Sequence, residues 1–238
     1  MALFITFEGG DGTGKSTQAT ALVDQLHKEK WYVIYAEEPG TTLLGKMLKE
    51  WLRDEDRSLT LIPKQDTQLS LIEQPIDDQL LPDILLHGVA PRAELLAFTI
   101  ARAQLVDEVI LPNLKNNNIV ICNRYADSTT AYQGYGRGLE LKLVEIANEI
   151  ATQGLKPNFT VLLDLAPEDG LARKWGTNRK DHFEKQVLDF HQRVREGYLK
   201  MAADDPERWL VVDASQSKAK IREIIWQRVS QLLSSQGG

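Results

Sequence analysis

Eight residues near the N-terminus constrain the fold of this chain more than any other part of its sequence. They read GGDGTGKS (Gly9–Ser16) and match the spacing G-x-x-x-x-G-K-[ST] of a phosphate-binding loop. The apolar run LFITF (Leu3–Phe7) precedes them, and an amphipathic segment follows from Ser16. In such a sequence, the backbone N–H groups of a glycine-rich turn and of a helix start form a polyphosphate site. The sequence therefore predicts an α/β protein with the P-loop NTPase fold.

Short apolar runs recur along the 238 residues and alternate with amphipathic segments. The runs are 3–7, 32–35, 119–122, 159–165 and 209–214. Each is continuously apolar, which is typical of strands covered on both faces. Apolar residues at helical spacing occupy 16–30, 91–115, 139–153, 182–202 and 218–235. We expect one domain over residues 1–238, built on a five-stranded parallel sheet with helices on both faces.

Two segments interrupt this alternation. Residues 54–88 contain three prolines and no sustained period, and we interpret them as a long insertion rather than a second domain. Residues 170–184 (GLARKWGTNRKDHFE) follow the fourth apolar run and carry basic side chains around the flexible tripeptide GTN. An acidic protein that binds ATP needs such a local cationic cluster, and the family resemblance described below implies that this segment is a short lid.

Composition argues against several classes of protein. The formal net charge of −6 disfavours a nonspecific nucleic-acid binder, which would carry a basic surplus. No apolar run approaches the roughly 20 residues of a transmembrane helix, and the apolar N-terminus lacks the basic lead of a signal peptide. The single cysteine, Cys122, lies inside an apolar run and has no partner for an intrachain disulfide. We expect a cytoplasmic protein that binds neither nucleic acid nor membrane.

The phosphate-binding motif predicts the roles of the residues in this loop. The Lys15 ammonium would reach the β- and γ-phosphates of a nucleotide, and the Ser16 hydroxyl would bind Mg²⁺. The predicted ATP-binding residues are Gly9, Gly10, Asp11, Gly12, Thr13, Gly14, Lys15, Ser16 and Thr17. This loop alone does not distinguish a kinase from a GTPase, an ATPase motor or a partitioning protein.

Five stretches of the sequence together narrow the choice among these classes of P-loop protein. FEGGDGTGKSTQ, EEPG, PRAELLAFTIARAQLVDEVI, NRYADSTTAYQGYGRG and DHFE resemble the bacterial thymidylate kinases. These are P-loop nucleoside monophosphate kinases that phosphorylate dTMP with ATP and Mg²⁺. The resemblance runs from Phe4 to about Ser215 and breaks only in 54–88. It implies ATP and dTMP as partners, a Mg²⁺ cofactor and a homodimer.

The residue chemistry of the acceptor side agrees with this resemblance. Phe98 and Arg102 are four residues apart on one predicted helix and therefore share a face. The resemblance implies that Phe98 stacks on thymine and that Arg102 bonds its O4. Arg124 follows the third apolar run, where open α/β sheets bind ligands, and its planar fork suits the dTMP phosphate that the matching family arginine holds. The resemblance also assigns to the dTMP site Asp11, Glu38, Ser128, Thr129, Tyr132 and Gln133.

Phosphoryl transfer needs a cation near the negative charge that develops in the transition state. Some thymidylate kinases carry an arginine for this role in the phosphate loop and others in a lid; loop 9–16 contains none, so the resemblance implies that the lid supplies it. Arg173 is the first choice and Arg179 the second. The predicted catalytic residues are therefore Lys15, Arg124, Arg173 and Arg179.

Three residues depart from the family pattern. Asn123 occupies the position of an aspartate that faces Mg²⁺, while Glu37 and His182 each replace an arginine. An amide keeps an oxygen ligand but loses charge, and outer-shell changes of this kind typically cost about 10- to 100-fold. We therefore favour a working dTMP kinase that transfers the phosphoryl group directly and in line, with Ser16 and Asn123 at the metal. The alternatives are a nucleotide-binding regulatory homologue with weak or no transfer, and a kinase of another nucleoside or nucleotide.

Overall fold

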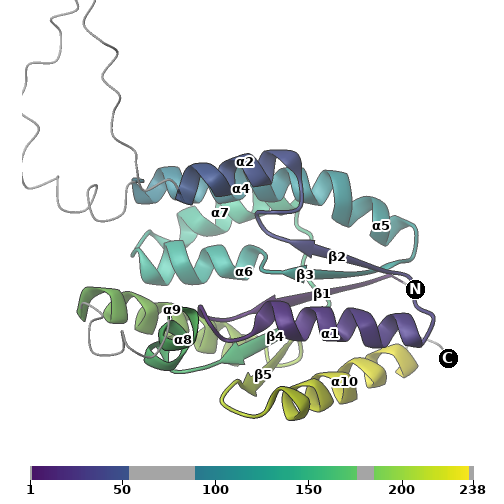
Figure 1. Cartoon of the computed structure of the whole chain (residues 1–238). Coiled ribbons are helices and arrows are strands. Elements are labelled where there is room, and N and C mark those ends of the chain that lie inside the picture. The colour runs from purple at the N-terminus through teal and green to yellow at the C-terminus, as the bar shows by residue number, and fades with distance from the viewer. Residues whose placement is uncertain (1, 54–88, 176–184, 236–238) are drawn as a thin grey trace, which may run out of the picture.

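The computed structural model describes residues 2–53, 89–175 and 185–235 (Figure 1). The predicted insertion at 54–88 lies outside these residues, as does the part of the predicted lid from 176 to 184. Arg179 and His182 belong to that part of the chain.

Five parallel strands form the sheet, in the order β2-β3-β1-β4-β5. They are β1 (Leu3–Glu8), β2 (Val33–Glu37), β3 (Ile119–Asn123), β4 (Phe159–Asp164) and β5 (Trp209–Asp213). Each strand coincides with one of the predicted apolar runs, and their bounds differ by one or two residues at most. The predicted five-stranded parallel sheet is confirmed.

Helices cover both faces of this sheet (Figure 1). The described residues contain α-helices and two π-helical turns, η1 and η2. In chain order they are α1 (Lys15–Lys28), α2 (Leu43–Arg53), α4 (Pro91–Leu105), η1 (Val106–Ile110), α5 (Leu111–Lys115), α6 (Ala126–Thr129), η2 (Thr130–Gly136), α7 (Leu141–Thr152), α8 (Pro167–Trp175), α9 (Lys185–Asp204) and α10 (Lys218–Ser235). The predicted helix 91–115 is a run of three pieces, α4, η1 and α5. In the described ranges, no helix is long and apolar enough to cross a membrane.

The two faces of the sheet bury different side chains because successive residues of a strand point in opposite directions. Leu3, Ile5 and Phe7 of β1 pack with α1 and α10 on one face. Phe4 packs on the other face with residues of α4 and η1, and the β4–β5 part of that face packs against α9. Helices on both sides explain why each strand is apolar along its whole length.

The carboxyl ends of three neighbouring strands meet at one edge of the sheet. Asn123, the last residue of β3, pairs in register with Phe7 of β1 and with Glu37 of β2. The segments that leave these strands therefore start side by side: the glycine-rich loop, the Glu38–Pro39 turn and the chain from Arg124 onward. Binding sites of open α/β sheets lie at this edge.

The segment after β3 adopts a helical form that its sequence did not predict. The short helix α6 widens into the π-helical turn η2. Such turns have i→i+5 hydrogen bonds and often occur at functional sites. Ser128, Thr129, Tyr132 and Gln133 all line one cavity from this segment.

Candidate active site

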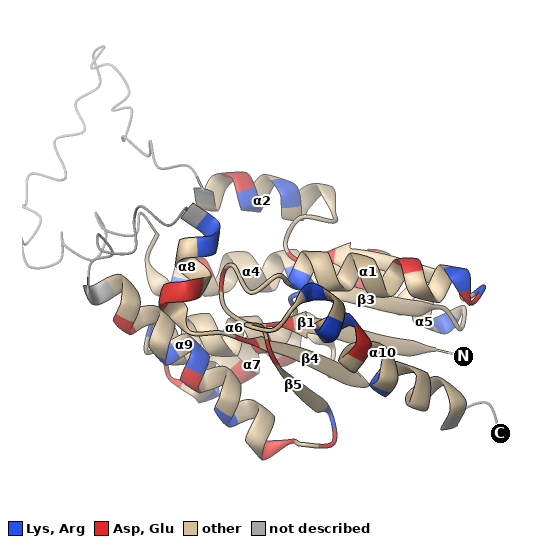
Figure 2. Ribbon diagram, turned by 60° about the horizontal axis from the view of Figure 1, so that its bottom comes forward, with Lys and Arg blue, Asp and Glu red and all other residues tan. Residues whose placement is uncertain are grey.

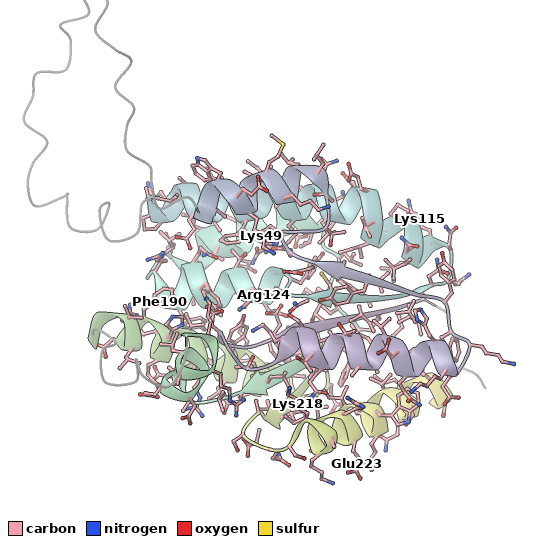
Figure 3. The ribbon with its side chains drawn as sticks, viewed as in Figure 1. Lys49, Lys115, Arg124, Phe190, Lys218 and Glu223 are labelled. Carbon is pink, nitrogen blue, oxygen red and sulfur yellow. The ribbon has the colours of Figure 1, made fainter. Side chains whose placement is uncertain are left out.

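A cavity of about 480 Å³ opens at the carboxyl edge of the sheet. The glycine-rich loop, the turn after β2, and parts of α2, α4, α6, η2 and α8 surround it. Its lining residues are Asp11, Gly12, Lys15, Ser16, Glu37, Glu38, Pro39, Lys49, Leu52, Glu94, Phe98, Asn123, Arg124, Ser128, Thr129, Tyr132, Gln133 and Lys174. Figure 3 shows two of them, Lys49 and Arg124, between α2 and the start of α1.

Most residues predicted for the nucleotides and the metal come together here. The cavity lining contains Asp11, Gly12, Lys15, Ser16, Glu38, Phe98, Asn123, Arg124, Ser128, Thr129, Tyr132 and Gln133. The other predicted loop residues, which complete the turn and start of α1 without lining the cavity, are Gly9, Gly10, Thr13, Gly14 and Thr17. Arg102 and Arg173 are not among the lining residues.

The glycine-rich loop packs so closely against α8 that a side chain would not fit at Gly12. A Cβ on Gly12 would lie 1.9 Å from the carbonyl oxygen of Gly170 in α8, and the φ of Gly12 is +71°. Helix α1 begins after Gly14 without a side-chain cap, so its first N–H groups remain available for a ligand. A helix N-terminus of this kind favours bound anions.

Lys15 folds back over the loop that precedes it. Its Nζ donates hydrogen bonds to the carbonyl oxygens of Gly9 (3.1 Å) and Gly10 (2.6 Å) and to Thr13 Oγ1 (3.3 Å). Burial lowers the pKa of Lys15 well below its usual value, and the positive charge of Arg124 acts in the same direction. Phosphate oxygens at this position would replace neutral carbonyl partners with anionic ones, which give stronger hydrogen bonds.

Arg124 lines the cavity and donates from Nη1 to the carbonyl oxygen of Gly9 in the glycine-rich loop (3.1 Å). Its φ of +74° is uncommon for a residue with a side chain, and its N–H donates to the carbonyl oxygen of Phe7 (3.0 Å). Strained backbone of this kind often occurs at functional sites. The guanidinium lies 4.9 Å from the centre of the Tyr132 ring and donates from Nη2 to Asp11 Oδ1 (2.9 Å) and Tyr132 OH (3.1 Å). The Arg124 guanidinium is therefore held between the glycine-rich loop and η2.

Asp11 joins this arginine to α8. Lys174 Nζ lies 2.7 Å from Asp11 Oδ2. Burial alone would raise the pKa of Asp11, but Arg124, Lys174 and Lys15 outweigh it and hold that pKa well below its usual range. Asp11 is therefore an anion that bridges two cations across the cavity.

Helix α8 presents a different cation to the cavity than the sequence suggested. Its last turn carries Arg173 and Lys174, within the predicted lid, and Figure 2 shows the blue of basic side chains at this end of α8. Arg173 Nη1 donates to the carbonyl oxygen of Ala214 (3.0 Å), after β5, whereas Lys174 lines the cavity. Because neighbouring residues on a helix point about 100° apart, only one of the two faces the glycine-rich loop.

Ser16 and Asn123 are adjacent, as predicted for a metal site. Asn123 Nδ2 donates to Ser16 Oγ (2.9 Å) and, at 3.4 Å, to Tyr35 OH. Asn123 Oδ1 is buried without a hydrogen-bond partner among the described residues. Within the same residues, no three His, Cys, Asp or Glu side chains gather as a metal site. Mg²⁺ usually keeps several waters and takes few protein ligands beside phosphates, so a hydroxyl and an orphaned amide oxygen fit it.

Glu37, one of the departures from the family pattern, has a partner in α2. Lys49 Nζ lies 2.8 Å from Glu37 Oε1, and both residues line the cavity. A positive charge therefore faces the cavity from α2, although the sequence has a carboxylate at position 37. Lys49 was not predicted as a site residue, because no motif links it to the end of β2.

Arg102 lies beneath the cavity rather than at its surface. It is fully buried, and its guanidinium forms an ion pair with the buried Glu38. It also donates to Asn148 Oδ1 (2.6 Å) and Thr129 Oγ1 (2.7 Å). A buried carboxylate needs a counter-charge, and Arg102 supplies it. Phe98, the other predicted thymine contact, does line the cavity, and the bond from Arg102 to thymine O4 stays a prediction.

Glu94 is a further lining residue that the sequence prediction missed. Its Oε1 accepts a hydrogen bond from Gln133 Nε2 (2.6 Å), and its Oε2 accepts from Arg137 Nη2 (2.9 Å). Glu94 precedes Phe98 by one turn of α4. Its i, i+4 spacing from Phe98 was the available signal.

Asp164, at the end of β4, forms an ion pair with α9. Arg195 of α9 donates to both of its oxygens, from Nε to Oδ1 (2.7 Å) and from Nη2 to Oδ2 (2.8 Å). This bidentate pair ties the helix after the lid to the sheet.

The fold and the cavity define a class of protein. A glycine-rich loop with Lys15 and Ser16 lines one cavity together with an arginine fork, at the carboxyl edge of a parallel sheet. This is the arrangement of P-loop phosphotransferases of the nucleoside monophosphate kinase type.

Comparison with known proteins narrows the class to a family. The thymidylate kinase family model matches residues 7–62 and 75–225, which leaves out only 63–74 of the intervening chain. A thymidylate kinase of Roseiflexus sp. (strain RS-1) is 40% identical over 99% of this chain and 96% of its own. A thymidylate kinase of Dehalococcoides mccartyi is 42% identical over 98% of each. The crystal structure of thymidylate kinase from Ehrlichia chaffeensis superposes with a TM-score of 0.67 at 27% identity, over 95% of this chain and 98% of that one. The chain belongs to the thymidylate kinase family.

Proposed function

We propose that this protein is an active dTMP kinase, which transfers the γ-phosphoryl group of ATP to dTMP in the presence of Mg²⁺ and forms dTDP. The observation that carries the proposal is the cavity that Lys15 and Ser16 of the glycine-rich loop line together with Arg124. Donor and acceptor phosphates bound by these residues would meet without a covalent protein intermediate.

The acceptor side supports this assignment residue by residue. Arg124 would bind the dTMP phosphate through its planar fork once that phosphate displaces Asp11 or Tyr132 from its N–H groups. Phe98 would stack on the base, and Glu94 and Gln133 lie beside it in the lining. A nucleoside monophosphate is already an anion near neutral pH, so positioning and electrostatics suffice and no strong base is needed.

Lys15, Ser16 and Asn123 act on the donor side of the proposal. Lys15 would exchange the carbonyl oxygens of Gly9 and Gly10 for the β- and γ-phosphates. Ser16 and Asn123 would hold Mg²⁺, which neutralises phosphate charge when it is bound. Arg173 remains the first choice and Arg179 the second for the lid cation, and Arg173 would have to release the carbonyl of Ala214. Lys174 already lies beside the loop and could contribute to the same charge.

A purified-protein assay separates this proposal from the two alternatives. The acceptors dTMP, dUMP and thymidine are each offered with ATP and Mg²⁺, alone and in competition. Preferential conversion of dTMP supports the proposal. Nucleotide binding with no product from any acceptor would favour a regulatory protein, and preferential conversion of another acceptor would favour a kinase of that compound.

We further propose that the protein works as a homodimer in the cytoplasm. Large apolar side chains are exposed on three adjacent helices, α2, α4 and α7, with α4 packed against the other two (Figure 1). They are Leu43, Met47, Trp51, Leu96, Ile100, Leu141, Leu143, Ile146 and Ile150. Exposed apolar side chains gathered on packed helices often mark a protein interface, and a second copy would cover them. The buried free thiol of Cys122 is compatible with a reducing compartment.

A further inference from the structure

One buried carboxylate near the cavity has no role in the mechanism above. Glu8 is the last residue of β1, and it is fully buried. Its Oε1 accepts a hydrogen bond from the backbone N–H of Tyr125 (2.8 Å). Its Oε2 accepts from Ser128 Oγ (2.5 Å) and from Tyr198 OH (2.9 Å). Such a group is expensive to bury, so its partners define what it does.

The same two hydroxyl groups also contact Arg124. Arg124 Nη1 donates to Ser128 Oγ (3.2 Å) and, at 3.4 Å, to Tyr198 OH, beside its hydrogen bond to the carbonyl oxygen of Gly9 (3.1 Å). A guanidinium has only donors, so each hydroxyl oxygen must accept from Nη1 and point its own proton elsewhere. Glu8 Oε2 can accept both protons, and the hydroxyl oxygens of Ser128 and Tyr198, 2.8 Å apart, can also share one of them. An ionised carboxylate can only accept, so at least one hydroxyl donates to Glu8 and neither points its proton at Arg124.

We propose that Glu8 is a positioning residue for Arg124: through Ser128 and Tyr198, its carboxylate holds the guanidinium in the orientation that receives the acceptor monophosphate. This inference rests on the proposed role of Arg124 in binding that phosphate. Glu8 itself touches neither substrate, because it lies behind Ser128 and outside the cavity lining.

The hydrogen bonds that join Glu8 to Arg124 through Ser128 and Tyr198 form a relay. Protonation of Glu8 would reverse hydrogen bonds in this relay. A protonated Oε2 donates to Ser128 or Tyr198, and that hydroxyl must turn its own proton to the other hydroxyl, 2.8 Å away, because Arg124 has no acceptor. The anion that accepted from the hydroxyl groups beside Arg124 is then lost. Burial raises the pKa of Glu8 to about 7, nearby Asp127 raises it too, and Ser128, Arg124 and Tyr198 oppose the rise. The other titratable or charged groups in its electrostatic environment are Lys15, Arg102 and Cys122.

The direction of the pH effect follows from this geometry. As pH rises through about 7, Glu8 loses its proton, the relay becomes ordered and the acceptor binds more tightly. The second ionisation of the acceptor phosphate, with a pKa of about 6, acts in the same direction. In a variant that cannot ionise at position 8, the ionisation of the acceptor phosphate still changes the affinity with pH, whereas the contribution of Glu8 is lost.

Glu8→Gln and Tyr198→Phe test the proposal by kcat and the KM for dTMP, measured from pH 6 to 9 at saturating ATP and Mg²⁺. In Glu8→Gln we expect a KM raised roughly tenfold at pH 8, a smaller change in kcat, and no KM transition near pH 7. Tyr198→Phe removes one hydroxyl and keeps the carboxylate. It should raise KM severalfold and retain the transition near pH 7. Glu196→Gln makes the same chemical change at an exposed position of α9 and should match the unmodified protein.

Several outcomes would overturn the inference. An unchanged KM and pH profile in Glu8→Gln would reduce Glu8 to a structural residue, even if the melting temperature falls. If Glu8→Gln does not fold, an unchanged KM in Tyr198→Phe has the same meaning. If the unmodified protein shows no dTMP turnover, the proposed function fails instead. The Kd of dTMP from calorimetry over the same pH range then replaces KM and tests the relay separately.

Discussion

Asn123 Nδ2 donates a hydrogen bond to Ser16 Oγ over 2.9 Å and so joins the end of β3 to the first turn of α1. The partner oxygen, Oδ1, is buried and has no hydrogen-bond partner in the described residues. An aspartate here could not donate to Ser16 and would instead accept the hydroxyl proton. The amide therefore changes the hydrogen bonding of the proposed metal site as well as its charge.

Asn123→Asp should lower the Mg²⁺ concentration for half-maximal turnover, by roughly tenfold, because it restores a carboxylate beside Ser16. Glu37, the in-register neighbour, is paired with Lys49, so the added charge does not face an unpaired carboxylate. A Mg²⁺ titration of kcat at fixed ATP measures the shift. Asn116→Asp adds the same charge at an exposed site before β3 and should change nothing. An identical Mg²⁺ dependence for Asn123→Asp would remove this residue from the metal site.

Arg124→Lys should reduce kcat/KM for dTMP by roughly 10²- to 10³-fold, because a point charge replaces a planar fork that can bind a phosphate through two N–H groups. The KM for ATP should change little, since Arg124 lies on the acceptor side. Steady-state kinetics with each substrate varied in turn distinguishes the two effects. Arg222→Lys on the exposed face of α10 is the matched control. Equal losses for both substrates would show that Arg124 is not specific to the acceptor.

Arg102→Met should destabilise the protein by about 3–5 kcal/mol, because it leaves the buried Glu38 carboxylate without its partner. The double variant Arg102→Met with Glu38→Leu should recover most of that loss, since no buried charge remains. Urea unfolding measures both. A single variant of normal stability but raised KM for dTMP would instead make Arg102 a direct substrate contact.

Ile150→Glu and Leu43→Glu should each convert a dimer into a monomer. These side chains are 74% and 76% exposed on α7 and α2, and a charge there would have to be buried in the interface. Light scattering after size-exclusion chromatography gives the mass. Val211→Glu alters an exposed apolar residue on β5, at the other edge of the sheet, and should leave the mass unchanged. A monomeric unmodified protein would contradict the proposed dimer.

The sequence predicted the sheet well because local composition determines it. Strands covered on both faces are apolar throughout, so each run marks a strand without any knowledge of its neighbours. The glycine-rich loop was also predicted correctly from the sequence, because close packing such as that of Gly12 against Gly170 requires glycine at fixed spacing. Helix α2 was missed, since its segment adjoins the stretch that had been interpreted as an insertion.

The cavity was harder to predict because its walls come from elements far apart in the chain. Arg102 pairs with Glu38, 64 residues earlier, and only the folded structure reveals that ion pair. Lys49 and Lys174 reach the cavity through the packing of α2 and α8, which no sequence spacing encodes. Where function depended on a local motif, as for Lys15 and Ser16, the residues were found.

Formation of dTDP by the purified protein, followed in a coupled assay with dTMP, ATP and Mg²⁺, tests the central claim most directly. We predict Mg²⁺-dependent turnover of dTMP in preference to dUMP and thymidine, even though Asn123 stands where a carboxylate is expected. Binding of ATP and dTMP without any dTDP, even at high enzyme concentration, would contradict this account.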